Sequence, residues 1–314
     1  MIYQKKLAML ACVLAFIVIL LGAYTRLTNA GLSCPDWPHC YGYLVAPHTK
    51  AQLETAFNRY PATPVNIKKA WTEMTHRYLA GTEGILVLAL VISIWGNRKK
   101  DSLSRMMSFV LMTLLCAQVL LGMLTVTEKL HPIIVLLHLL IGLSILSILW
   151  RLFLCMLSRP LIHRKTRSLW LWIGLILIGL QITLGGFVST HSAGLACIDF
   201  PYCNGQLIPA LNWHALNSDL ITIHMLHRLG ALVVAVYFGI LAILLWQSPT
   251  ERRIGTFIFI LIALQITLGI TNILWLRPVP IALLHLATAI GLLLITITVL
   301  SSPQKAPSSP LSQK

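Results

Sequence analysis

The chain has 314 residues, of which 57% are hydrophobic and only 11% are charged, and its mean hydropathy is +0.81. A soluble domain needs a charged surface, so this composition excludes an ordinary soluble protein and indicates one embedded in a lipid bilayer. The formal net charge of +15 comes from short basic clusters between apolar runs, a pattern that sets membrane topology and argues against nucleic-acid binding.

Eight apolar runs are long enough to cross a bilayer, for which about 20 residues are needed. We therefore predict an all-α integral membrane protein with eight transmembrane helices, near residues 7–24, 76–95, 106–127, 132–154, 169–188, 221–246, 255–275 and 279–300. The first run, preceded by Lys5 and Lys6, also has the form of a signal peptide. The internal repeat gives this run a counterpart in the fifth, so we expect it to be retained.

Lysine and arginine are unevenly distributed between the predicted loops. They are dense before the first run and between runs two and three, four and five, and six and seven, whereas the other loops carry fewer for their length. Because positively charged loops stay in the cytoplasm, we expect both termini there. The tail 301–314 is rich in Ser, Pro and Lys and is predicted to be disordered and cytoplasmic.

The chain repeats itself. Three segments of the first half recur in the second, at offsets of 163, 151 and 147 residues: Gly31–Cys40 as Gly194–Cys203, His76-Arg77 as His227-Arg228, and Gln118–Gly122 as Gln265–Gly269. Each half then contains four helices, and an even number gives both halves the same orientation. We therefore predict two tandem four-helix bundles, residues 1–155 and 156–300, related by a pseudo-two-fold axis along the membrane normal.

Four histidines occupy matched positions near the outer ends of the even-numbered predicted helices: His76, His138, His227 and His285. A single histidine at such a place is more often hydrogen-bonded between helices than a ligand. Two symmetric pairs favour a bound metal, because a neutral imidazole nitrogen is a common ligand. Zinc prefers more ligands in a tetrahedral arrangement, whereas two axial imidazoles suit heme iron. Because no Cys-x-x-Cys-His segment occurs, the predicted heme is non-covalent.

Charged residues accompany two of these histidines. Arg77 and Arg228 are candidates for binding heme propionates, with contacts to lipid headgroups as the alternative. Glu73 lies three residues before His76, on the same face of a helix, and the matching position in the second half is His224. This difference predicts that one heme reacts while the other passes electrons. Glu73 would then transfer protons or stabilise a developing cation; the alternative is a solvated carboxylate in the first helical turn.

The predicted outer loops contain two cysteine pairs, Cys34 with Cys40 and Cys197 with Cys203. The outer compartment of bacteria is oxidising, so two disulfides within the loops are expected. With the intervening proline and aromatic residues, they predict a rigid lid over the histidines. The alternative is a redox-active dithiol that exchanges with a thiol-redox partner.

Two further features are interpreted as structural. Gln118, Gln181 and Gln265 each begin a Gln-x-x-Leu-Gly segment, in which the small glycine permits close approach of helices. Asp36 and Asp199, within the cysteine loops, are predicted to form turns.

Together these features resemble the heme A synthase family over nearly the whole chain. The resemblance is carried by the tandem four-helix halves, the Gly-Leu-x-Cys loops, and the residues Glu73-x-x-His76-Arg77, His138, His227-Arg228 and His285. The family oxidises the C8 methyl group of heme O to the formyl group of heme A by successive hydroxylation, for use in cytochrome c oxidase and related oxidases.

The resemblance implies a role for each residue. His76 and His138 would flank substrate heme O in the N-terminal half, His227 and His285 would ligate heme b in the C-terminal half, and Glu73 would be the required acid. Cysteine pairs in both loops, as in bacterial members, imply a bacterial inner membrane with the heme sites toward the outer face. An electron acceptor and the handover of heme O from a heme O synthase are further implied.

Two rival interpretations remain. A bis-histidine cytochrome b would relay electrons from quinol without substrate chemistry; Glu73 argues against this, because a relay needs no acid. A transporter with parallel repeats would need polar groups and broken helices near the membrane midplane, which the sequence does not show at matched positions.

Overall fold

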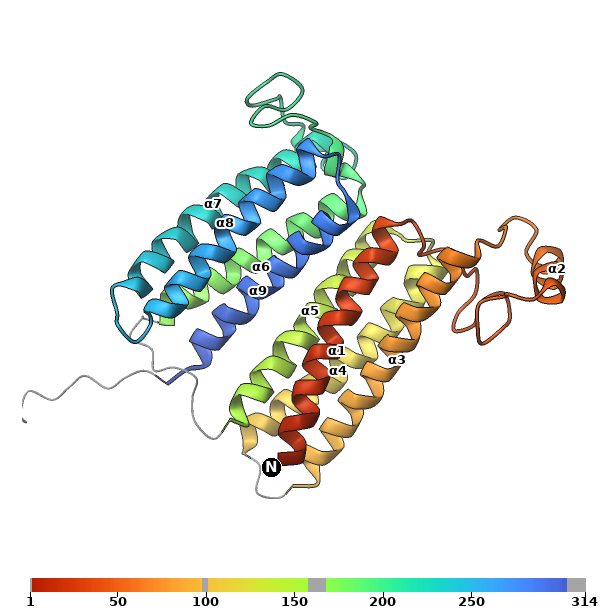
Figure 1. Cartoon of the computed structure of the whole chain (residues 1–314), viewed down its shortest axis with the longest axis horizontal. Coiled ribbons are helices and arrows are strands. Elements are labelled where there is room, and N and C mark those ends of the chain that lie inside the picture. The colour runs from red at the N-terminus through yellow and green to blue at the C-terminus, as the bar shows by residue number, and fades with distance from the viewer. Residues whose placement is uncertain (1, 98–100, 158–167, 304–314) are drawn as a thin grey trace, which may run out of the picture.

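A computed structural model describes residues 2–97, 101–157 and 168–303 of the chain. In this part, eight helices are long and apolar enough to cross a membrane: α1 (Ile2–Leu27), α3 (Ile67–Trp95), α4 (Ser102–Thr127), α5 (Pro132–Cys155), α6 (Ser168–Thr190), α7 (Leu220–Trp246), α8 (Arg252–Leu274) and α9 (Val279–Ser301). They form one helical body without sheet in the described ranges (Figure 1). The prediction of an all-α protein with eight membrane spans is confirmed.

Several helix starts follow local side-chain chemistry, and that of α3 lies well before its apolar run. The Asn66 side chain caps α3 by accepting a hydrogen bond from the Lys69 amide at 3.1 Å, and proline stands in the first turn of α5 and of α9. Helix α3 therefore begins at Ile67, and the predicted start at residue 76 was wrong. The first turns of α3 are polar, so a prediction based on apolar length misses them.

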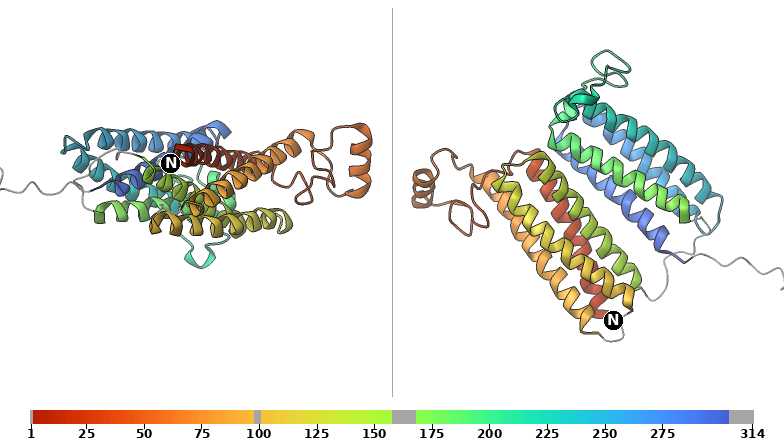
Figure 2. Two further views of the ribbon diagram at one scale, coloured as in Figure 1. Left: turned by 90° about the horizontal axis from the view of Figure 1, so that it is seen from below. Right: turned by 180° about the vertical axis from the view of Figure 1, so that it is seen from behind.

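Helices α1, α3, α4 and α5 lie together, and helices α6 to α9 lie together beside them (Figures 1 and 2). The groups meet where α5 packs against α6 and α9 and where α1 packs against α9. One apolar cluster runs through both groups and includes the fully buried Leu90, Leu149, Phe238 and Ile290. In lipid such packing rests on van der Waals contact between helices.

The loops contain three short helices that the sequence analysis did not predict: α2 (Lys50–Arg59), η1 (Ala193–Leu195) and η2 (Trp213–Ala215). Helix α2 starts with a capping box, in which the Thr49 hydroxyl accepts from the Gln52 amide and the Gln52 side chain accepts from the Thr49 amide. The loop that carries α2 projects from the end of α3 (Figure 2).

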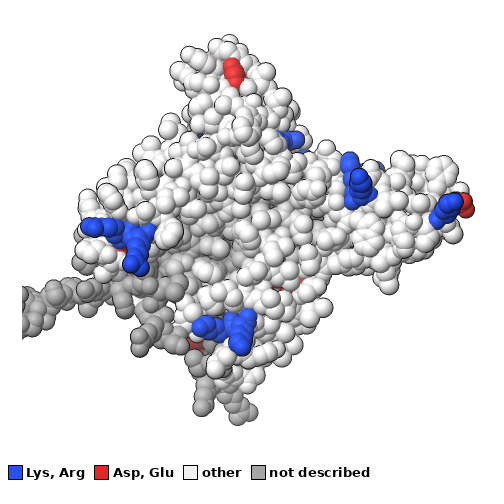
Figure 3. All heavy atoms as spheres, in the orientation of Figure 1, with Lys and Arg blue, Asp and Glu red and all other residues white. Residues whose placement is uncertain are grey.

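Most charged residues lie near the ends of the helices; Glu83, in the middle of α3, is buried. On the face in Figure 3, the lysine and arginine side chains lie toward the periphery and on the first loop, while the middle shows none of them. An uncharged band between charged ends is typical of a membrane protein. The basic residues 98–100 and those in 158–167, on which the predicted orientation depends, lie outside the described residues. The predicted tail also lies largely outside them, since α9 ends at Ser301 and the description at residue 303.

Candidate functional site

Each of the four matched histidines packs against a glycine of the preceding long helix. A Cβ atom added at the glycine would lie 3.0 to 3.3 Å from the Cε1 atom of the imidazole, in the pairs Gly22 with His76, Gly122 with His138, Gly185 with His227, and Gly269 with His285. Carbon atoms in ordinary contact are about 3.5–4.0 Å apart, so a larger residue would push the ring away. The same glycine–imidazole contact is therefore built four times, twice in each half.

Glutamine holds two of these rings. The Gln181 side-chain nitrogen lies 3.0 Å from Nδ1 of His227 and donates to the His227 carbonyl at 2.9 Å. The Gln265 side-chain nitrogen lies 3.2 Å from Nε2 of His285. Glutamine and glycine stand four residues apart, on one face of their helix. The Gln-x-x-Leu-Gly segments, predicted only to pack, thus position imidazoles, and their spacing was the signal that we missed.

The four histidines line a cavity of about 1290 Å³ that reaches into both groups of helices. Glu73, Arg77 and Arg228 line it too. Pockets for one small molecule are usually about 300–1,000 Å³ and mostly apolar, so this cavity is larger than a single small ligand requires. The predicted site residues are thus brought together around one space.

The spacing of one histidine pair, His227 with His285, fits two axial ligands of a heme. The ring centres of His227 and His285 are 6.4 Å apart. A ring nitrogen binds a metal ion at about 2 Å and lies about 1 Å from its ring centre, so two rings on one ion have centres about 6 Å apart. In the described ranges, Nδ1 of His76, of His138 and of His285 is buried without a hydrogen-bond partner. These rings keep bonding capacity that the chain itself does not use.

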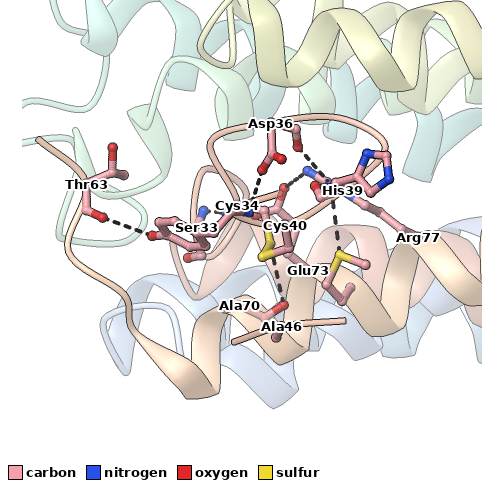
Figure 4. Close-up of a disulfide and its surroundings, with 12 residues drawn as sticks. Ser33, Cys34, Asp36, His39, Cys40, Ala46, Thr63, Ala70, Glu73 and Arg77 are labelled. Carbon is pink, nitrogen blue, oxygen red and sulfur yellow. Dashed lines mark hydrogen bonds and ion pairs between the residues drawn. A yellow bond between two sulfur atoms is a disulfide. The ribbon is translucent and has the colours of Figure 1, made fainter. Parts of the chain in front are cut away.

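Glu73 is buried, with 4% of its surface exposed. One carboxylate oxygen accepts the backbone N–H groups of Ser33 and Cys34 at 2.8 and 3.0 Å, and the other accepts Nη2 of Arg77 at 2.6 Å (Figure 4). The alternative of a solvated carboxylate in the first turn is wrong, because α3 starts earlier and the first loop covers Glu73.

His224 makes the corresponding contact in the second half. Its Nδ1 atom accepts the backbone N–H of Cys197 at 3.3 Å, and 5% of the residue is exposed. A carboxylate in one half and an imidazole in the other therefore hold the same backbone position of the loop. The halves share the contact with the cysteine N–H, but Glu73 is acidic and accepts the Ser33 N–H as well.

The arginines that follow His76 and His227 hold the same loops. Arg77 donates to the carbonyl groups of Asp36, Pro38 and His39 at 2.7 to 3.3 Å. Arg228 donates to those of Cys197, Asp199 and Tyr202 at 2.8 to 3.1 Å. Both guanidinium groups are thus engaged by backbone oxygen, and binding of propionates by these arginines stays a prediction.

The loops themselves are closed by the expected disulfides, Cys34–Cys40 and Cys197–Cys203. The Asp36 carboxylate accepts the N–H groups of Tyr41 and Gly42, and Asp199 accepts those of Asn204 and Gly205, at 2.6 to 2.8 Å. The predicted turn-forming role is confirmed. Hydrogen bonds from Gly205 and then Asn204 hold the pKa of Asp199 below its usual range. Gly42 and Gly205 have φ of +83° and +81°, which favours glycine.

Comparison with known proteins identifies the family. The profile described as cytochrome oxidase assembly protein (COX15-CtaA) matches residues 5–297, and the heme A synthase of Shewanella oneidensis is 37% identical over 311 residues, covering 91% of this chain and 92% of the relative. The chain belongs to the heme A synthase family. Heme A synthases of Ehrlichia ruminantium (28% identical, 89% and 87% covered) and Neorickettsia sennetsu (26%, 96% and 98% covered) are also similar.

Membership in the heme A synthase family confirms the resemblance found in the sequence. It places the chain among oxidoreductases of cytochrome oxidase assembly. The matched region contains all four histidines, both cysteine loops and Glu73, so each element of the cavity belongs to the part shared with the family.

Proposed function

We propose that this protein oxidises the C8 methyl group of heme O to the formyl group of heme A by successive hydroxylation. His76 and His138 would hold substrate heme O, and His227 and His285 would hold a non-covalent heme b. The observation that carries the proposal is the glycine–imidazole contact repeated four times around one cavity, with one histidine pair at the spacing of two axial ligands.

Different residues of the chain have different roles in the proposed reaction. The four glycines leave room for the imidazoles, and Gln181 and Gln265 orient two of the rings. Heme b, when bound, supplies one-electron redox chemistry. Glu73 stands at the substrate side of the cavity and accepts a proton as the methyl group is oxidised, and Arg77 stays beside it. The first loop covers Glu73 through the N–H groups of Ser33 and Cys34.

The two halves form two domains, residues 1–155 and 156–300, related by a pseudo-two-fold axis along the membrane normal. The matched contacts of loops, glycines and histidines support this arrangement. The protein lies in a bacterial inner membrane with both termini in the cytoplasm and the heme sites toward the outer face. The support is that the disulfide loops contact Glu73 and His224, each three residues before a matched histidine, and that disulfides persist in oxidising compartments.

The disulfides act as structural links. Cys34, Cys40, Cys197 and Cys203 are at most 1% exposed, and exchange with a thiol-redox partner requires access to a sulfur atom. Partners of the reaction are a heme O synthase, which hands over heme O, and an electron acceptor. The lipid bilayer supplies the apolar surroundings through which the farnesyl tail enters.

The proposal is tested by extracting heme from cells that make this protein together with a heme O synthase but lack another heme A synthase. We expect heme A with the wild-type chain, and heme O without heme A for Glu73→Ala, which should still bind heme b. If the wild-type chain forms no heme A while binding heme b, the protein is a bis-histidine cytochrome b that relays electrons.

A further inference from the structure

Two arginines from different halves meet at the outer end of the cavity. Arg26 lies in the last turn of α1, and Arg277 lies in the turn before α9; both line the cavity. Both also contact the start of the second cysteine loop, where Nη2 of Arg26 donates to the Ser192 hydroxyl at 3.2 Å and Arg277 packs against Gly194. Nη2 of Arg26 reaches across to the end of α6, where it donates to the carbonyls of Ser189 and Thr190 at 2.9 and 3.3 Å. Its guanidinium group is thereby fixed at the junction of the two groups of helices.

Neither arginine has a counterpart in the other half. A Cβ added at Gly194 would lie 3.4 Å from Cδ of Arg277, whereas at the matching Gly31 it would lie 3.3 Å from the Leu130 side chain. Leu130 thus occupies in the first half the place that Arg277 occupies in the second. Arg26 is likewise matched by Ser189, so the pair of charges is not a by-product of the repeat.

No carboxylate of the described residues balances this pair. Glu73 pairs with Arg77, and the carboxylates of Asp36 and Asp199 accept hydrogen bonds from their own loops. Glu83 also lines the cavity, but its carboxylate is buried without a hydrogen-bond partner among the described residues. Nη2 of Arg26 already donates to oxygen atoms of residues 189–192, but these acceptors carry no formal charge, so a bound anion would lower the repulsion between the two half-buried guanidinium groups. The place therefore suits an anionic ligand that enters the cavity.

A heme fits this requirement, because its two propionates lie on one edge. Arg26 stands one turn outward from Gly22, on the face of α1 that touches His76, and Arg277 stands eight residues before His285. A heme held by either histidine pair with its propionates directed outward would bring them toward Arg26 and Arg277. Arginine binds a carboxylate with two parallel hydrogen bonds.

We propose that Arg26 and Arg277 form a carboxylate site for heme propionates at the junction of the halves, with Arg26 serving the heme of the N-terminal half and Arg277 serving heme b. This rests on the proposed function only in assuming that heme is bound in both halves. Arg77 and Arg228 then hold the loops, while Arg26 and Arg277 fix the depth of the hemes and keep their propionate edges adjacent.

The test titrates the full chain, purified from heme-limited cells, with protoheme and with protoheme dimethyl ester, which has no free carboxylate. We expect the wild-type chain to bind the ester about tenfold more weakly. Arg277→Leu and Arg26→Ser, which introduce the matching residues of the other half, should each reduce this discrimination. Arg277→Lys should restore part of it, and Arg253→Leu, an exposed position at the far end of α8, is the control.

Equal binding of acid and ester by the wild-type chain overturns the proposal, as does unchanged discrimination in both variants. The phosphate of a lipid headgroup is the other anion of suitable chemistry. If the variants change only the response to phosphatidylglycerol vesicles relative to phosphatidylcholine vesicles, the site belongs to lipid and the proposal fails. This titration does not depend on conversion of heme O to heme A. If the wild-type chain discriminates acid from ester here but forms no heme A in cells that make heme O, the proposed function is refuted and this site still stands.

Discussion

Replacing Gly185 by alanine tests the glycine–imidazole contact directly. The added Cβ would lie 3.0 Å from Cε1 of His227, which is about 0.5 Å inside ordinary carbon contact, so the ring or α6 must shift. Overpacking of this kind costs about 1–3 kcal/mol. If this free energy is taken from the heme-bound state, affinity for heme b falls about 5- to 150-fold.

The measurement is heme b per chain after purification, with the affinity of the heme-free protein for protoheme determined by absorption. Gly179→Ala is the matched control, because it lies on the same helix and its Cβ would meet no atom within 4 Å. We expect the control to bind like the wild-type chain. Equal heme b binding by Gly185→Ala and Gly179→Ala would refute the claim that glycine makes room for a ligating imidazole.

The remaining predictions concern the second layer of the site. Glu73→Gln should leave the first loop as resistant to protease as in the wild type, because an amide oxygen still accepts its N–H groups, but should stop heme A formation; normal conversion would remove Glu73 from proton transfer. Gln181→Ala should weaken heme b binding about 10- to 100-fold, and unchanged binding would show that the ring needs no support. Asp199 has a lowered pKa in the folded loop, so its stabilisation is present above the unfolded pKa of about 3.9 and is lost as pH falls through the folded value. Cleavage of the second loop by pepsin should therefore rise with acidification in the wild type and depend less on pH in Asp199→Asn; identical pH profiles would contradict this.

Much of the architecture follows from the sequence, because the bilayer imposes length and apolarity on each span. The eight helices and the four histidines were predicted on that basis, and the repeat of the cysteine loops was visible in the residues. The helix boundaries could not be predicted in the same way, because α3 begins at Ile67, after its cap Asn66, and its first turns are polar. Helix α2 was missed although its capping box, Thr49 with Gln52, was present in the sequence.

The hydrogen-bond partners of Glu73 could not be predicted from the sequence. Its partners Ser33 and Cys34 are about forty residues away, and only the folded loop brings their N–H groups to one carboxylate oxygen. The hydrogen bond from Arg26 to Ser189 joins the two halves, and no spacing pattern in the sequence predicts it. Spacing within a helix is readable from a sequence, whereas the approach of a loop or of a second bundle depends on the whole fold.

The central claim is that one cavity holds a reacting heme and a resident heme b in different halves. It is tested most directly by the type and number of hemes per chain in protein purified from cells that also make a heme O synthase. We predict heme b together with heme O or heme A in the wild type, loss of heme b alone in His227→Ala, and loss of heme O and heme A alone in His76→Ala. Loss of the same heme in both variants, or heme b as the sole heme of the wild type, would contradict the account.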